Sequence, residues 1–135
     1  LTGGGGESGP ESRVPPVPLT RFTRGGVTTV VGVLGTDDVT RTTASLVAAA
    51  RGLVAEGLSA WCHTGGYHLP PTTLTGSVRG DIVHVDRIIG VGEVALRDHR
   101  SSQPTLDVAG SSSPALHFAM KPLMASRLGP PEPGS

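Results

Sequence analysis

The sequence has 135 residues with 11 basic and 11 acidic side chains, so its formal net charge is +0 and its length allows at most one domain. A balanced charge without clustered basic side chains lacks the electrostatic footprint of a nucleic-acid-binding protein. No apolar run approaches the roughly 18 residues of a membrane span and no signal-like segment opens the chain, so we expect a cytoplasmic protein with neither a nucleic-acid nor a membrane partner.

Glycine and proline are concentrated at the two ends of the chain. The sequence contains 20 glycines and 12 prolines, many of them in the first 18 residues or in the closing GPPEPGS, so we expect most of the order in the middle. The chain begins with Leu1 rather than with a methionine, which we interpret as the start of a piece of a longer protein. The single cysteine, Cys62, cannot form an internal disulfide.

The first regular elements are a predicted strand and helix. Residues 27–34 (VTTVVGVL) are β-branched and apolar between glycines, which predicts a strand buried on both faces. Residues 42–56 predict a helix with threonine at its N-cap and Gly57 at its end. The apolar side chains expected on one face of this helix are Leu46, Ala49, Ala50, Leu53 and Val54.

Two further βα units follow. Residues 58–62 form a second short apolar run, residues 63–75 read as a loop, and residues 78–89 as an amphipathic segment. A third strand is predicted over residues 91–96. Strands repeating at about 30 residues with helices between them indicate an α/β fold with parallel βα repeats, either a small open sheet or a slice of a barrel.

Polar residues gather where the predicted strands end. These are the stretches 35–38 (GTDD), 63–68 (HTGGYH) and 98–100 (DHR). In parallel α/β architectures, functional side chains lie at the carboxyl ends of the strands. The pattern therefore indicates a site at this edge of the sheet.

Four strings in the same order and spacing closely resemble the isoaspartyl (β-aspartyl) dipeptidases of the amidohydrolase superfamily. They are GGGGESGPESR, GVTTVVGVLGTDDVTR, LSAWCHTGGYHLPPTTLTGSVRGD and DRIIGVGEVALRDHRSSQPT (residues 3–13, 26–41, 58–81 and 86–105). We therefore divide the chain into residues 1–105, a partial amidohydrolase barrel with a glycine-rich loop and about three βα units, and residues 106–135, a divergent tail expected to be disordered.

The resemblance implies a (β/α)8 TIM barrel whose complete site holds two zinc ions. These ions share a hydroxide, which attacks the isopeptide carbonyl of a β-aspartyl dipeptide. In the family, Gly5 and Gly6 lie against the substrate, and Glu7 meets the substrate α-amino group. Thr36 matches a threonine that contacts the substrate. These residue types suit the tasks, because glycine permits close approach and a carboxylate pairs with an ammonium.

Two more residues match family positions that handle the substrate. Tyr67 matches the tyrosine that polarises the scissile carbonyl, so Tyr67 and Glu7 are the candidate catalytic residues. Arg100 matches the arginine that pairs with the substrate carboxylate. The resemblance is also compatible with a homo-oligomer of the complete parent enzyme.

Glu93 stands where the best-known members carry a carboxylated lysine that bridges the metals. A carboxylate can also present two oxygens to two zinc ions, so Glu93 is the candidate metal ligand. The remaining ligands of the family do not occur in this sequence, so we expect the 135-residue chain alone to be an inactive fragment.

Other interpretations remain for these residues. The glycine run could be a flexible terminus. A phosphate-binding loop is unsupported, because no Lys-Ser/Thr follows the glycines. Glu93 could pair with Arg97 or Arg87 instead of a metal. Cys62 reads as a core residue rather than a nucleophile. We interpret the histidines as structural or as supports for the site rather than as direct metal ligands: His63, His68, His84 and His99.

Two alternatives belong to other functional classes. One is a non-catalytic truncated product with open sheet edges, and the other is a small α/β binding module complete in itself.

Overall fold

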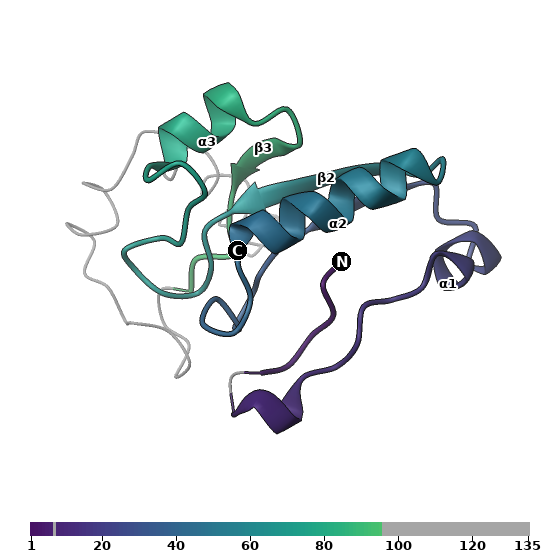
Figure 1. Cartoon of the computed structure of the whole chain (residues 1–135), viewed down its shortest axis with the longest axis horizontal. Helices are drawn as coiled ribbons and strands as arrows, with labels where there is room; N and C mark the ends of the chain where they lie inside the picture. Colours follow the sequence, from purple (N-terminus) through teal and green to yellow (C-terminus); the bar gives the residue numbers. More distant parts are fainter. Residues whose placement is uncertain (7, 96–135) are drawn as a thin grey trace, which may run out of the picture.

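A computed structural model describes residues 1–6 and 8–95 of the chain. Its elements, in chain order, are η1 (Pro10–Ser12), α1 (Leu19–Arg24), β1 (Thr29–Gly32), α2 (Thr43–Ala55), β2 (Ser59–Thr64), α3 (Val78–His84) and β3 (Ile88–Val91). The three strands form one parallel sheet in the order β1-β2-β3 (Figure 1). The predicted α/β fold class with parallel βα units is confirmed. None of the helices in these described ranges is long and apolar enough to cross a membrane.

The predicted helix is present almost to the residue. The hydroxyl of Thr42 accepts from the Ser45 backbone N–H at 3.1 Å, and the Ser45 hydroxyl accepts from the Thr42 N–H at 3.2 Å. This reciprocal capping satisfies two donors that the first helical turn leaves unpaired. Val47 is buried whereas Val54 is 39% exposed, so the core-facing stripe lies slightly to one side of the predicted one.

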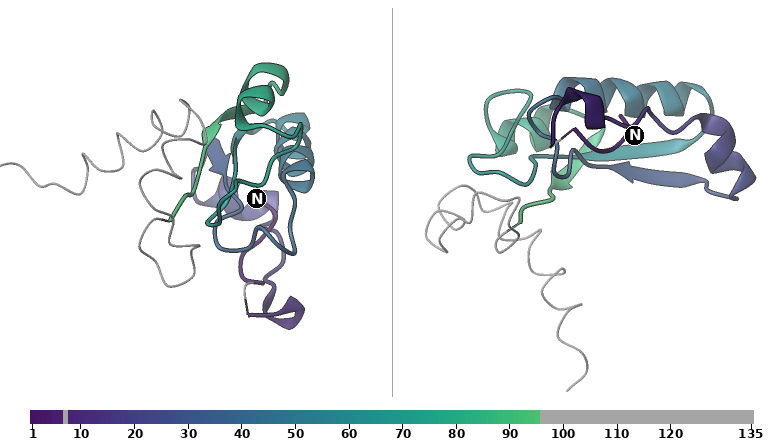
Figure 2. Two further views of the ribbon diagram at one scale, coloured as in Figure 1. Left: turned by 90° about the vertical axis from the view of Figure 1, so that its left-hand side faces the viewer. Right: turned by 90° about the horizontal axis from the view of Figure 1, so that it is seen from below.

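The hydrophobic core lies between the sheet and helices α2 and α3. Figure 2 shows α2 running along one face of the sheet. Alternate residues of β2 point into this core, as the two-residue period of a strand requires. The buried cluster comprises Leu34, Leu46, Val47, Ala50, Ala60, Cys62, Val85 and Ile88.

The opposite face of the sheet is open in the described part of the chain. Val31 in β1 is 48% exposed and Ile89 in β3 is 51% exposed. The prediction that the first strand is buried on both faces is therefore wrong for Val31, because the helices in the described residues cover only one face of the sheet.

The third strand begins earlier than predicted. β3 spans Ile88–Val91 rather than residues 91–96, because α3 ends at His84 and leaves Ile88 free to enter the sheet beside Cys62. Gly90 does not interrupt the strand. A side-chain carbon there would lie 3.3 Å from the His63 ring, so glycine lets the two strands approach. Glu93 consequently follows the strand instead of lying within it.

Candidate functional site at the carboxyl edge of the sheet

Three loops leave the carboxyl ends of the strands at one edge of the sheet, toward the left in Figure 1. They contain the predicted site residues Thr36, Tyr67 and Glu93. The backbone N–H of Tyr67 donates a hydrogen bond to the carbonyl of Gly35 at 3.0 Å. The segments that carry Thr36 and Tyr67 are therefore joined directly.

The second link between these loops is an aspartate–histidine pair. Oδ1 of Asp38 lies 2.6 Å from Nδ1 of His68, and Oδ2 accepts from the His68 backbone N–H at 3.2 Å. The side chain of Asp38 is only 3% exposed. The structural role predicted for His68 agrees with this contact.

The glycine-rich segment packs against the loop after β1. Gly6 is buried at φ +102°, and a side-chain carbon there would lie 2.1 Å from Oδ2 of Asp37. At Gly5, with φ +67°, the same carbon would lie 2.2 Å from the Ser12 carbonyl oxygen. Both glycines are therefore demanded by packing, and the structure places them beside the predicted site. Glu7 lies outside the described residues.

A buried ion pair holds this segment in place. Nε of Arg41 lies 3.1 Å from Oδ2 of Asp37, and the two side chains are each only 2% exposed. The guanidinium also donates to three backbone carbonyls of the N-terminal segment, those of Thr2, Gly4 and Val14. A planar group with five donors suits such a cluster of acceptors. The N-terminal segment is thus anchored, contrary to the flexible-terminus interpretation.

Hydrogen bonds keep Asp37 ionised despite its burial. Burial alone would raise the pKa of this carboxyl, but the Thr40 hydroxyl and N–H and the Arg41 guanidinium hold it below the ordinary value. Sequence reasoning missed Arg41. The available signal was the Asp-x-x-x-Arg spacing in DDVTR, which by itself does not reveal that the partners are distant backbone carbonyls.

Asp81 is a second buried carboxylate that the sequence did not single out. It is 0% exposed, and it accepts hydrogen bonds from the Thr64 hydroxyl at 2.5 Å and from the backbone N–H groups of Leu74 and Thr75 at 2.9 and 2.7 Å. Burial acts to raise its pKa, but these donors hold the pKa below the ordinary value. Asp81 therefore ties α3 to the end of β2 and shapes the loop that follows Tyr67.

Glu93 is exposed at the same edge. One of its carboxylate oxygens lies 3.8 Å from the position that a side-chain carbon on Gly35 would occupy, which places Glu93 next to the loop of Thr36. Arg87 pairs instead with Asp86 at 3.2 Å and lies 4.2 Å from the centre of the Trp61 ring. The alternative partner Arg97 lies outside the described residues, as does Arg100.

The described residues do not assemble a metal site by themselves. No group of three or more histidine, cysteine, aspartate or glutamate side chains in residues 1–6 and 8–95 is arranged to hold an ion. The His63 ring packs against the backbone at Gly90 and Gly92, and burial lowers its pKa. His84 is exposed in the last turn of α3, and His99 lies outside the described range. The metal-binding role of Glu93 stays a prediction.

Cys62 behaves as a core residue, as predicted. It is fully buried, and burial raises the pKa of its thiol to about 11. A thiol with so high a pKa is almost entirely protonated near neutral pH, so it is a poor nucleophile.

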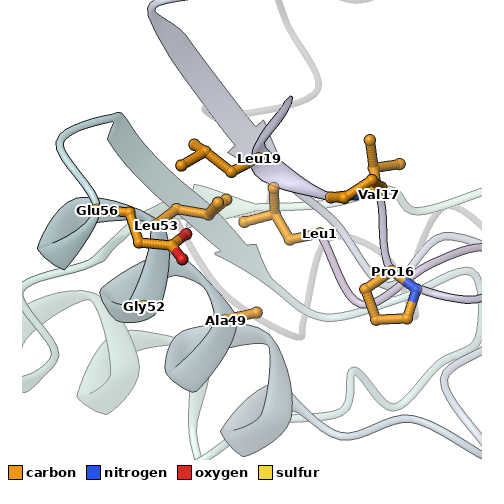
Figure 3. A pocket seen from close by; sticks show the side chains of 9 residues that line it. Leu1, Pro16, Val17, Leu19, Ala49, Gly52, Leu53 and Glu56 are labelled. Carbon is orange, nitrogen blue, oxygen red and sulfur yellow. The ribbon is translucent and has the colours of Figure 1, made fainter. Parts of the chain in front are cut away.

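An open pocket lies away from this edge, between α2 and the N-terminal segment (Figure 3). Its volume is about 440 Å³, and its lining is mainly aliphatic. The lining residues are Leu1, Pro16, Val17, Pro18, Leu19, Ala49, Gly52, Leu53 and Glu56. None of them is a predicted site residue, so the pocket is not the candidate site.

Comparison with solved structures shows that this chain is similar to part of an enzyme of known structure. The chain is similar to a β-aspartyl dipeptidase from the thermophilic, keratin-degrading Fervidobacterium islandicum AW-1, in two crystal structures, one of them in complex with a β-Asp-Leu dipeptide. Sequence identity is 52% and the TM-score is 0.76 in both. The match covers 81% of this chain but only 30% and 31% of the two dipeptidase chains. No family model matches the sequence.

Proposed function

We propose that the chain, which is similar to a β-aspartyl dipeptidase over 81% of its length, represents a substrate-facing part of such an enzyme, which hydrolyses β-aspartyl dipeptides. The observation that carries this proposal is the direct link between the Thr36 and Tyr67 loops at the carboxyl edge of the sheet. It occurs in a chain 52% identical to a protein crystallised with β-Asp-Leu.

Each candidate residue has a distinct task in this proposal. The phenol of Tyr67 donates a hydrogen bond to the scissile carbonyl oxygen and stabilises the negative charge that develops there. Thr36 contacts the substrate, and the backbones of Gly5 and Gly6 approach it closely. Glu7 pairs with the substrate ammonium.

Arg100 pairs with a carboxylate of the substrate. Together with Glu7 it would hold charged groups of the dipeptide so that the isopeptide bond lies at Tyr67. Holding the reacting groups in this way lowers the entropic part of the barrier.

Zinc dependence of the complete enzyme is part of the proposal. A zinc ion supplies a hydroxide at neutral pH and polarises the carbonyl when it is bound. Glu93 would be one ligand, and the others would come from outside the described residues. Because this chain spans about 30% of the dipeptidase chain, we propose that the 135 residues alone are inactive.

The complete enzyme would close into a (β/α)8 barrel. Val31 and Ile89, now exposed on the open face, would then face its interior. The proposed setting remains the cytoplasm, and a homo-oligomer of the complete enzyme is compatible with the proposal.

A graft tests this proposal. Residues 1–105 replace the matching stretch of the Fervidobacterium islandicum enzyme, and turnover of β-Asp-Leu is compared with that of α-Asp-Leu. We expect turnover of the β-linked dipeptide only, lost on chelation and restored by zinc. A folded graft that hydrolyses neither dipeptide, or retains full activity without metal, would contradict the proposal. The isolated chain with zinc should show no turnover.

The open sheet face favours a second candidate, a non-catalytic truncated product. Two β-branched side chains, Val31 and Ile89, are about half exposed on that face. Exposed apolar faces and unpaired strand edges promote association. A concentration-dependent aggregate of the isolated chain would support this candidate, whereas a sharp, concentration-independent melt would argue against it.

A further inference from the structure

The carboxyl group of Asp38 is buried and makes two contacts with His68 in the neighbouring loop. Its two carboxylate oxygens contact the ring and the backbone N–H of His68, at 2.6 and 3.2 Å. The Asp38 side chain is 3% exposed, whereas that of His68 is 40% exposed. The carboxylate thus reaches from the loop after β1 to the residue that directly follows Tyr67.

Tyr67 is bracketed by contacts with the loop after β1. Before it, Gly66 packs so closely against Asp38 that a side-chain carbon on Gly66 would lie 2.5 Å from the Asp38 Cβ. At Tyr67 itself, the N–H donates to the Gly35 carbonyl at 3.0 Å. After it, His68 is held by Asp38. Three successive residues are therefore tied to the same loop.

The two consecutive aspartates of that loop point to different partners. Asp37 binds Thr40 and Arg41 and lies against Gly6. Asp38 instead faces the segment of Tyr67. Asp38 is therefore the side chain that couples the loop of Thr36 to the loop of the phenol.

We propose that Asp38 is a positioning residue that fixes the Tyr67 phenol relative to Thr36, an inference that rests on the substrate-facing roles proposed above. An ionised carboxylate only accepts hydrogen bonds, so Nδ1 of His68 must carry a proton. A side chain that acts on a transition state must be held within a fraction of an ångström, and such precision comes from hydrogen bonds around it.

The single tyrosine of the chain provides a direct test. Fluorotyrosine labelling of the 135-residue chain gives one fluorine resonance, that of Tyr67. Asp38→Ala removes both acceptors, and we expect the resonance to shift and broaden. The matched control is Asp86→Ala, which removes a carboxylate whose side chain is 63% exposed and should leave the resonance unchanged.

A conservative variant separates positioning from simple stabilisation. In Asp38→Asn, the amide oxygen can accept from the His68 N–H while the amide nitrogen donates to Nδ1. In that orientation His68 would carry its proton on Nε2, which the chemical shifts of its ring nitrogens detect. We expect this change of tautomer together with a Tyr67 resonance close to that of the parent chain.

Two results would overturn the inference. One is a Tyr67 resonance in folded Asp38→Ala that matches the parent or the Asp86→Ala control. If Asp38→Ala does not fold, Asp38→Asn decides. An amide cannot keep both acceptor bonds of the carboxylate, so His68 ring and backbone N–H shifts that both match the parent chain contradict the contact. If only the proposed function is wrong, the pattern differs. The graft shows no turnover, but the Tyr67 resonance still shifts in Asp38→Ala. In an active graft, Asp38→Ala should lower kcat about tenfold or more with KM changed by less than about threefold.

Discussion

Arg41 and Asp37 form an ion pair at 3.1 Å that is almost completely buried, and through it a glycine-rich N-terminal segment is fixed to the carboxyl edge of the sheet. The pair lies four residues apart in a loop rather than on a helix. Arg41 also donates to the carbonyls of Thr2, Gly4 and Val14, so the pair joins the N-terminal segment to the loop after β1.

Arg41→Met should destabilise the chain by about 3–5 kcal/mol, because it leaves Asp37 as a buried carboxylate without its charge partner. Urea unfolding measures this change in the free energy of unfolding. The control is Arg51→Ala, which breaks an exposed pair with Asp86 and should cost less than about 1 kcal/mol. Equal losses in the two variants would contradict the anchoring role of Arg41.

Gly6→Ala should destabilise the chain by about 1–3 kcal/mol or more, because a positive φ of 102° is strained for alanine and its Cβ would meet the Asp37 carboxylate at 2.1 Å. At Gly4 a Cβ would have no neighbour within 4 Å, so Gly4→Ala is the matched control. Thermal unfolding of the two variants checks the difference. A Gly6→Ala variant as stable as Gly4→Ala would show that the segment does not pack as described.

Stability should fall in acid through Asp37 and Asp81. Their folded pKa values lie below 3.8, the unfolded value, so each carboxylate contributes stability that is complete above that pH and is lost as the pH falls through the folded pKa. Unfolding free energies measured from neutral pH to strong acid test this. Asp81→Asn should flatten the curve, and an unchanged curve would contradict the role of its hydrogen bonds to Thr64 and Thr75.

Cys62 should resist alkylation in the native chain, because burial both excludes the reagent and raises the pKa of the thiol to about 11. Iodoacetamide labelling followed by mass spectrometry, with and without denaturant, measures this protection. Modification of the native chain at the rate of the denatured chain would place Cys62 outside the core.

Local signals predicted α2 well because its determinants are near in sequence. Thr42 and Ser45 cap one another, and Gly57 adopts φ +99° directly after the helix. The strand β3 was placed too late, because only its pairing with β2 reveals that Gly90 sits beneath the His63 ring. A glycine usually predicts the end or interruption of a strand, but here the pairing with β2 keeps Gly90 inside β3.

The similarity to β-aspartyl dipeptidase structures confirms the family resemblance read from the sequence. The substrate-facing roles of Thr36, Tyr67 and the glycine-rich segment stay predictions. Arg41 and Asp81 were missed because many of their partners are backbone groups or hydroxyls in other loops, such as the Gly4 carbonyl for Arg41 and the Thr64 hydroxyl for Asp81. No spacing rule encodes such partners, so only the folded structure reveals these buried supports.

The central claim is that this chain supplies the tyrosine that polarises the scissile bond in a β-aspartyl dipeptidase. The most direct measurement is kcat for β-Asp-Leu in the grafted enzyme with Tyr67→Phe, which removes only the phenolic oxygen. We predict a loss of about 10²–10³-fold in kcat, with the thermal stability of the graft unchanged. Unchanged kcat in the phenylalanine variant of an active graft would contradict the claim.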